Sequence, residues 1–250
     1  MAHPQKGYME INPNKPIGEI AVEYDDAIEL FEKRNINYAF GGRQTLQDAC
    51  EQAGIPSQEI LSTLETMKHS NPGERALDWS DRSMEAIIDH IITCQHAFIR
   101  LRLAVFCKKS TELAKTVGEA DPSVVQLNKA ILDIAQHLEE HMKEEEDLIF
   151  PHLKEMEQAY AHGENRSNPY RELSVPQHPI AKLSWKHEVM WDQWVTLRKL
   201  TNDYQAPAGA NPDFVDLCRG LKEFQEIFQE HGHLEDNILF RKAVKSGFLD

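Results

Sequence analysis

The stretch HGHLEDNILF, residues 231–240, repeats a pattern that stands ninety positions earlier in HMKEEEDLIF, residues 141–150. Each stretch has a histidine, a glutamate four residues later, and then two aliphatic residues and a phenylalanine. Residues four apart lie on the same face of an α-helix, so each pair would direct one imidazole and one carboxylate at the same point. The repeat therefore predicts two helices that carry matching polar pairs, His141 with Glu145 and His231 with Glu235.

Both polar pairs lie on apolar stripes that continue along their segments in steps of three and four residues, which is the spacing of one helix face. In the last segment the stripe consists of Phe214, Leu217, Leu221, Phe224, Phe228 and Ile238. In the earlier segment it consists of Leu127, Ile131, Ile134, Leu138 and Leu148. Because these stripes would face a core, the four polar side chains are expected inside the protein.

Two further helical segments each place one histidine on an apolar stripe. Over residues 81–117 the stripe is Ile87, His90, Cys94, Ala97 and Leu101. Over residues 173–202 it is Ile180, Leu183, His187, Met190, Trp194 and Leu197. His96 lies six positions after His90, about 240° around an ideal helix, and is therefore expected off the stripe. The predicted inward histidines of these two segments are His90 and His187.

The sequence has helical periodicity throughout and no alternating apolar pattern typical of strands. The second long segment begins at Asp121 and Pro122 and the fourth at Asn211 and Pro212, a capping residue followed by proline in the first turn. Four long segments with short connections favour an all-α fold, an antiparallel up-down-up-down four-helix bundle over residues 81–250. A tail (1–15), a small helical domain (16–68) and a polar linker (69–80) are expected before it.

Composition excludes several classes of partner. The chain has 27 basic and 41 acidic residues, a formal net charge of −14, which would be repelled by nucleic acid and by an anionic membrane surface. No apolar stretch approaches the roughly 20 residues that span a bilayer, and the amino terminus lacks the apolar segment of a secretion signal. The four cysteines are scattered, which indicates neither a disulfide framework nor a zinc knuckle. A cytoplasmic protein is expected.

Six inward side chains would thus converge from four helices: His90, His141, Glu145, His187, His231 and Glu235. Burying two ionised carboxylates without counter-charge would cost several kcal/mol each, and two divalent cations would remove that cost. Each glutamate could bridge the cations, and each cation could take two histidines and keep open positions for a small ligand. Imidazole and carboxylate without thiolate suit iron, with manganese or zinc as lesser candidates. The alternative is a set of core histidines that pair with the glutamates and hold no metal.

The order of these residues resembles the hemerythrin-like di-iron bundle, and specifically the repair-of-iron-centres family (the YtfE/ScdA type). The segments IIDHII, HMKEEEDLIFP and HLEDNILF are similar to the metal-binding segments of that family. The stretch AIELFEKRNINYAFGGRQTLQDACEQAGI resembles its small ScdA-type N-terminal domain. The resemblance spans nearly the whole chain and implies two non-haem iron ions.

This chain departs from the family pattern at several positions. Oxygen-carrying hemerythrins have a fifth histidine one turn beyond the third-helix ligand, where this chain has Trp191, and an aspartate in the last helix, where it has Glu235. An oxygen-carrier function is therefore less favoured. The small domain of the relatives has two adjacent cysteines before its glycine pair, and here Ala39 and Phe40 stand there. Lys186 replaces a glutamate that often precedes the third-helix ligand.

The resemblance implies a protein of the nitrosative and oxidative stress response that helps to repair damaged iron-sulfur clusters. It would do so by donating iron, or by binding or reducing nitric oxide at a carboxylate-bridged di-iron site. Its expected partners are nitric oxide, oxygen and damaged iron-sulfur proteins. A sensor or reservoir for oxygen, nitric oxide or iron is the alternative, and the absence of the cysteine pair favours it. Enzymatic activity as a nitric oxide reductase, oxidase or peroxidase is left open.

Overall fold

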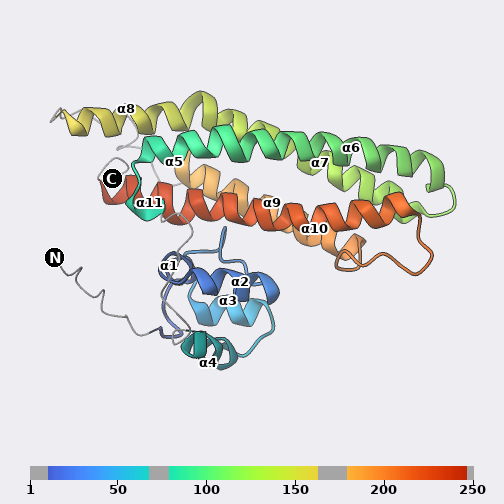
Figure 1. Cartoon of the computed structure of the whole chain (residues 1–250), viewed down its shortest axis with the longest axis horizontal. Coiled ribbons are helices and arrows are strands. Elements are labelled where there is room, and N and C mark those ends of the chain that lie inside the picture. The colour runs from blue at the N-terminus through green and yellow to red at the C-terminus, as the bar shows by residue number, and fades with distance from the viewer. Residues whose placement is uncertain (1–10, 68–78, 163–178, 247–250) are drawn as a thin grey trace. The chain divides into compact units, whose positions relative to one another are not determined.

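The computed structural model describes residues 11–67, 79–162 and 179–246. The chain divides into two compact units, Met1–Asp78 and Trp79–Asp250 (Figure 1). The described residues are helical apart from turns and one isolated bridge between Pro16 and Thr45. The predicted all-α class is confirmed. Most of the expected tail and linker, and the expected helix start at residue 173, lie outside the described residues.

Over residues 11–67 the first unit contains four short helices. They are α1 (Ile17–Glu23), α2 (Asp25–Lys33), α3 (Leu46–Gln52) and α4 (Ser57–Met67). Thr45 caps α3 by accepting a hydrogen bond from the Asp48 amide. Gly54, with φ of +70°, allows the chain to reverse after α3 because this left-handed conformation costs glycine little. Buried aromatic and aliphatic side chains, among them Phe31 and Leu46, form the core of this unit.

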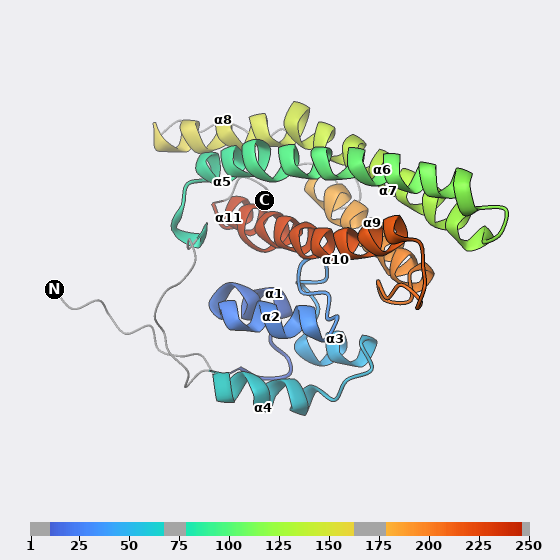
Figure 2. The same cartoon turned by 45° about the vertical axis from the view of Figure 1, so that its right-hand side comes forward.

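The described residues of the second unit form a bundle of four long rods, each built from one or more helices, whose arrangement is visible in Figures 1 and 2. The first rod consists of α5 (Met84–His90), η2 (Ile91–His96) and α6 (Ala97–Val117), and the second of α7 (Pro122–Glu144), η3 (Glu145–Ile149) and α8 (Phe150–Ala161). The third is α9 (Pro179–Leu200). The fourth consists of α10 (Pro212–Gly232), η5 (His233–Leu239) and α11 (Phe240–Lys245). Helix α6 packs on α7 and α10, and α7 packs on α9.

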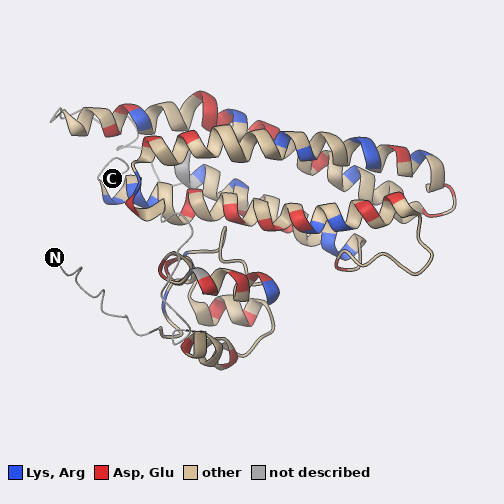
Figure 3. Ribbon diagram, viewed as in Figure 1, with Lys and Arg blue, Asp and Glu red and all other residues tan. Residues whose placement is uncertain are grey.

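The rod ends are fixed by side-chain caps. Asp121 accepts a hydrogen bond from the Ser123 amide at the start of α7, and Asn211 does the same for α10. Each is followed by proline, whose missing amide hydrogen would have had no partner in the first turn. Acidic and basic residues are interspersed along the rods (Figure 3). In the described part of the bundle and of the first unit, no helix is long and apolar enough to cross a membrane.

Three rods contain a π-helical segment, η2, η3 or η5. In each segment the wider turn brings a residue five positions along the chain onto the buried face, beside the residue four positions along. The five-residue steps run from Ile91 to His96, from Glu145 to Phe150 and from Glu235 to Phe240. Because π-helical turns occur frequently at functional sites, their position directs attention to the polar residues at these steps.

Along the bundle axis, apolar layers lie on both sides of the polar residues at the π-helical segments. Beyond the π-helical segments the core includes Ile88, Ile91, Phe150, Leu153 and Phe240, joined by further aliphatic residues of all four rods. On the other side, a buried aromatic group continues the core, with ring centroids 5.5–5.7 Å apart. Its members are Phe106, Trp194, Phe224 and Phe228. The polar residues between these layers are therefore shielded from water along the bundle axis.

Candidate metal centre

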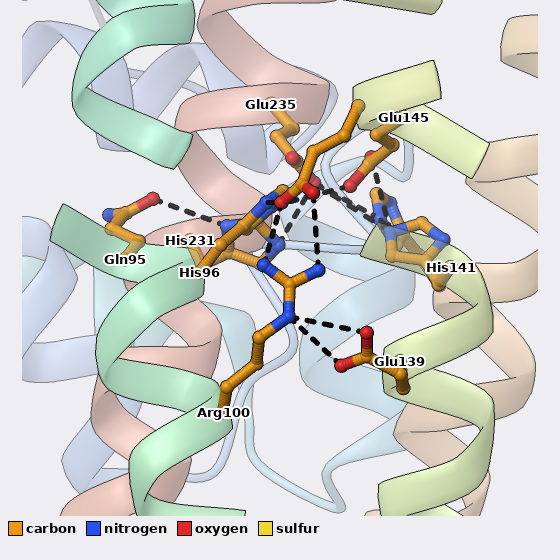
Figure 4. A network of polar contacts seen from close by, with 10 residues as sticks. Gln95, His96, Arg100, Glu139, His141, Glu145, His231 and Glu235 are labelled. Atoms are coloured by element: carbon orange, nitrogen blue, oxygen red, sulfur yellow. Dashed lines mark hydrogen bonds and ion pairs between the residues drawn. The ribbon is translucent and has the colours of Figure 1, made fainter. Parts of the chain in front are cut away.

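Six buried side chains from all four rods meet between the two apolar layers. They form two overlapping groups of donors, and within each group one atom from every residue lies within 4.8 Å of the others. Both groups contain Glu145 and Glu235. The first adds His96 and His231, and the second adds His141 and His187. All six side chains are at most 1% exposed, and Figure 4 shows five of them converging.

In the first group the histidines approach the two glutamates through Nε2. His96 Nε2 lies 3.5 Å from Glu145 Oε2, and His231 Nε2 lies 3.3 Å from Glu235 Oε2. Neither contact has the geometry of a hydrogen bond, and within the described part of the chain both Nε2 atoms lack a hydrogen-bond partner. Two imidazole nitrogens therefore face the carboxylates from opposite rods without being bonded to them.

The second group is more compact. His141 Nε2 lies 3.2 Å from Glu145 Oε1, and His187 Nε2 lies 3.2 Å from Glu235 Oε2. The two Nε2 atoms are 2.8 Å apart. Two imidazole nitrogens that bind a first-row metal at about 2.1 Å and at right angles would be about 3 Å apart, close to this separation. The geometry therefore fits one cation between His141 and His187.

The carboxylates provide the strongest argument for cations. All four carboxylate oxygens of Glu145 and Glu235 are buried and have no hydrogen-bond partner among the residues that the structure describes. Buried acceptors without partners are rare and costly, more so when they carry charge. Two divalent cations, each shared by both carboxylates, would satisfy all four oxygens together with the buried Nε2 atoms of His96 and His231. The residues present thus fit a two-metal site.

Protonation in the metal-free form follows from the same contacts. Burial opposes charge on every group, but the two glutamates overcome it and raise the pKa of His96 and His141, and Asp236 with Glu235 raises that of His187 further. Burial dominates at His231 and lowers its pKa to about 4. Despite burial, the neighbouring histidines lower the pKa of Glu235 well below its usual range. The same contacts thus favour the ionised form of the Glu235 carboxylate.

Five of the six residues predicted from the sequence lie in this cluster, and His90 does not. The ring of His90 is half-buried at the end of α5 and stacks on Trp79, with centroids 4.4 Å apart. His96 occupies the corresponding place in the cluster. This difference from the predicted position has a physical cause, because the π-helical segment η2 shifts the buried face by one residue.

The rest of the predicted first-rod stripe is displaced in the same way. Leu101 is 64% exposed, and Cys94 and Ala97 are exposed as well. The true buried stripe continues from His96 through Ile99 and Leu103. A signal was present in the sequence, because Ile87 and Leu103 are both apolar but sixteen residues apart, about 160° around an ideal helix, and they come closer to one face only where the helix is locally widened.

Comparison with known proteins identifies the cluster's family. A model described as the hemerythrin HHE cation-binding domain matches residues 87–243, which is more than half of the chain. The chain belongs to the hemerythrin HHE family. The ScdA_N model, a domain of unknown function, matches residues 13–68. Both parts of the predicted resemblance are thus confirmed, and the HHE family supplies the cation-binding character that the donor geometry indicates.

Relatives of this HHE protein align over almost the whole chain. The iron-sulfur cluster repair protein YtfE of Yersinia pseudotuberculosis is 26% identical over 93% of this chain and 97% of its own length. A probable iron-sulfur cluster repair protein of Haemophilus influenzae is 28% identical over 91% of this chain and 96% of its own length. YtfE of Shigella boydii is 27% identical over 92% of this chain. The alignments therefore span both units of this chain.

Proposed function

We propose that this chain is a di-iron protein that helps to restore damaged iron-sulfur clusters during nitrosative or oxidative stress. The observation that carries the proposal is the set of four buried, unpartnered carboxylate oxygens within reach of four histidines. Its support is the match of both units to proteins described as iron-sulfur cluster repair proteins. The cytoplasm is the proposed location, and damaged iron-sulfur proteins and nitric oxide are the proposed partners.

The proposed ligands differ from the sequence prediction by one residue. His96 and His231 would bind one iron ion, His141 and His187 the other, and Glu145 and Glu235 both ions. Iron is favoured over manganese and zinc because all six donors are imidazole or carboxylate, as in other non-haem iron sites. As a ferrous pair, two such ions can bind nitric oxide and can together supply two electrons.

The protein's own residues provide three conditions for this chemistry. The four rods hold the donors in place, because each ligand sits on a helix and not on a loop. The aromatic and aliphatic layers on both sides exclude bulk water, which strengthens electrostatic interactions within the site. Each ion would receive two imidazoles and shared carboxylates, which leaves coordination positions for a small ligand.

A reconstitution assay tests the proposal. Metal-free protein loaded anaerobically with ferrous ions should retain two irons per chain, and the loaded protein should restore activity to an enzyme whose cluster nitric oxide has damaged. Glu235→Gln, which removes a charge shared by both groups, should lose iron and repair activity together. If wild-type protein retains two irons but restores no activity beside an active relative, the repair function is refuted and the metal site stands.

A sensor or reservoir for oxygen, nitric oxide or iron is the second candidate, and the first unit supplies the observation that favours it. Ala39 and Phe40 provide no thiol, and burial raises the pKa of the Cys50 thiol, the one cysteine of that unit. A raised pKa makes a thiol unreactive. A sensor would bind nitric oxide stoichiometrically without restoring clusters. Steady consumption of nitric oxide or peroxide with an electron donor would instead indicate an enzyme.

A further inference from the structure

Two acids outside the ligand set contact the far side of two of the clustered histidines. Nδ1 of His96 lies 2.7 Å from Oε1 of Glu146, and Nδ1 of His187 lies 2.9 Å from Oδ2 of Asp236. Each acid immediately follows one of the shared glutamates, Glu145 or Glu235. Each acid thereby contacts a histidine on a different rod. Glu146 of the second rod contacts His96 of the first, and Asp236 of the fourth rod contacts His187 of the third.

Helical geometry explains why adjacent acids serve different purposes. Consecutive helical residues point about 100° apart, so a glutamate directed at the bundle centre leaves its successor directed at a neighbouring rod. Glu145 is fully buried, whereas 26% of the Glu146 side chain is exposed; Glu235 is fully buried, whereas 11% of the Asp236 side chain is exposed. The same division of roles thus occurs in both halves of the repeated pattern.

Both outer acids are themselves held in place. Arg100 donates from its two terminal nitrogens to the two carboxylate oxygens of Glu146, at 2.8 and 3.2 Å, and donates from Nε to Glu139 at 3.0 Å. Figure 4 shows the link between Arg100 and Glu139. Ser184, one turn before His187, donates its hydroxyl to Asp236 at 3.0 Å. Neither carboxylate can rotate away from its imidazole without breaking a second interaction.

We propose that Glu146 and Asp236 are positioning residues that orient His96 and His187 toward the two metal positions, one anchor histidine for each ion. The inference rests on the metal site proposed above. A carboxylate that accepts from Nδ1–H fixes the tautomer, so that Nε2 carries the lone pair directed at the cluster. It also increases the electron density that the ring offers to a cation.

The remaining two histidines lack this support, which gives each metal position one anchored and one less constrained ring. His231 Nδ1 meets the neutral amide oxygen of Gln95 at 3.2 Å. His141 Nδ1 is buried and has no hydrogen-bond partner among the described residues. Loss of one outer acid should therefore weaken one metal position selectively, the His96 position for Glu146 and the His187 position for Asp236.

Two charge-removing variants with matched controls test this inference. Glu146→Gln and Asp236→Asn keep the shape of the side chain and remove its charge. Glu144→Gln is the control for the first, because Glu144 flanks Glu145 on the other side but pairs with Lys182 and Lys186. Glu230→Gln is the control for the second, since Glu230 precedes His231 and is exposed.

The measurement is anaerobic titration of each metal-free protein with ferrous ions against a competing chelator. In each outer-acid variant one of the two positions should bind about 10- to 100-fold more weakly, the usual effect of removing such a partner. The second position and both controls should bind as wild type does. Cobalt(II) titration provides a separate readout, because the visible spectrum of one of the two bound ions should change in each outer-acid variant.

A double-mutant cycle separates positioning from general destabilisation. If Glu146 acts through His96, Glu146→Gln should cause no further loss of metal in a His96→Ala background but its full loss in a His187→Ala background. Unchanged affinities and spectra in both outer-acid variants, or equal additivity in both backgrounds, would overturn the inference. Failure of wild-type protein to bind two ions would instead refute the metal site, so the two failures are distinguishable.

Discussion

Replacing His96 by alanine, beside the same change at His90, tests the structure against the sequence pattern. His96 is fully buried in the first donor group, whereas His90 is half-buried and stacks on Trp79. Apparent binding energies of about 10–16 kcal/mol for four-ligand zinc sites correspond to about 2.5–4 kcal/mol per ligand. At about 1.4 kcal/mol for each factor of ten, His96→Ala should weaken one metal position by roughly 100- to 1,000-fold.

The assay is iron content after anaerobic reconstitution and desalting. His96→Ala should retain about one iron per chain, because His141 and His187 still serve the other position. His90→Ala should retain both irons and lose only the ring stacking with Trp79, about 0.5–1.5 kcal/mol of unfolding free energy. Full iron content in His96→Ala together with loss of iron in His90→Ala would refute the helix phase described above.

Three further predictions follow from burial and protonation. Glu235→Gln should release both irons, measured by metal analysis, because both donor groups contain this carboxylate; retention of two would contradict the bridging role. The pKa values of His141 and His187 are raised in the metal-free form, so ferrous binding near neutral pH should release protons. The number of protons released should fall as the pH rises above those pKa values. A titration with a pH indicator measures the release, and its absence would contradict the assignment of these histidines as ligands. Leu103→Ala should lower the free energy of unfolding by about 2–5 kcal/mol, whereas Leu101→Ala, at an exposed position, should lower it by less than about 0.5 kcal/mol. Denaturant unfolding measures both values. Equal losses would mean that the two side chains are equally buried, contrary to the structure.

The sequence pattern predicted most of the bundle because its signals are local. Asp121 and Asn211 cap the helices that were expected to begin there. The stripes that end in His141 and His231 lie in unbroken α-helix, so steps of three and four lead directly to buried positions. His187 follows the same rule in α9, where the described residues contain no π-helical turn.

The first rod shows where periodicity was insufficient. An ideal repeat carried forward from Ile87 through His90 predicts a buried Leu101, but the added residue in η2 exposes Leu101 and buries His96. Leu148, predicted on the second stripe, is 48% exposed because it lies within η3. The stability of a π-helical turn depends on the contacts that its shifted side chains make. Here those contacts are with carboxylates on other rods, and the residue spacing within one segment does not reveal them.

The extra residue in three of the rods also limits how this site could be transplanted. A designer who copied its six donors onto uninterrupted ideal helices could direct each histidine and glutamate inward, but the phenylalanines five residues after Glu145 and Glu235 would then rotate off the core face. The apolar cover formed by Phe150 and Phe240 would be lost, and solvent would enter from that end. Transfer of this site to another bundle therefore requires the three π-helical segments as well as the donor side chains.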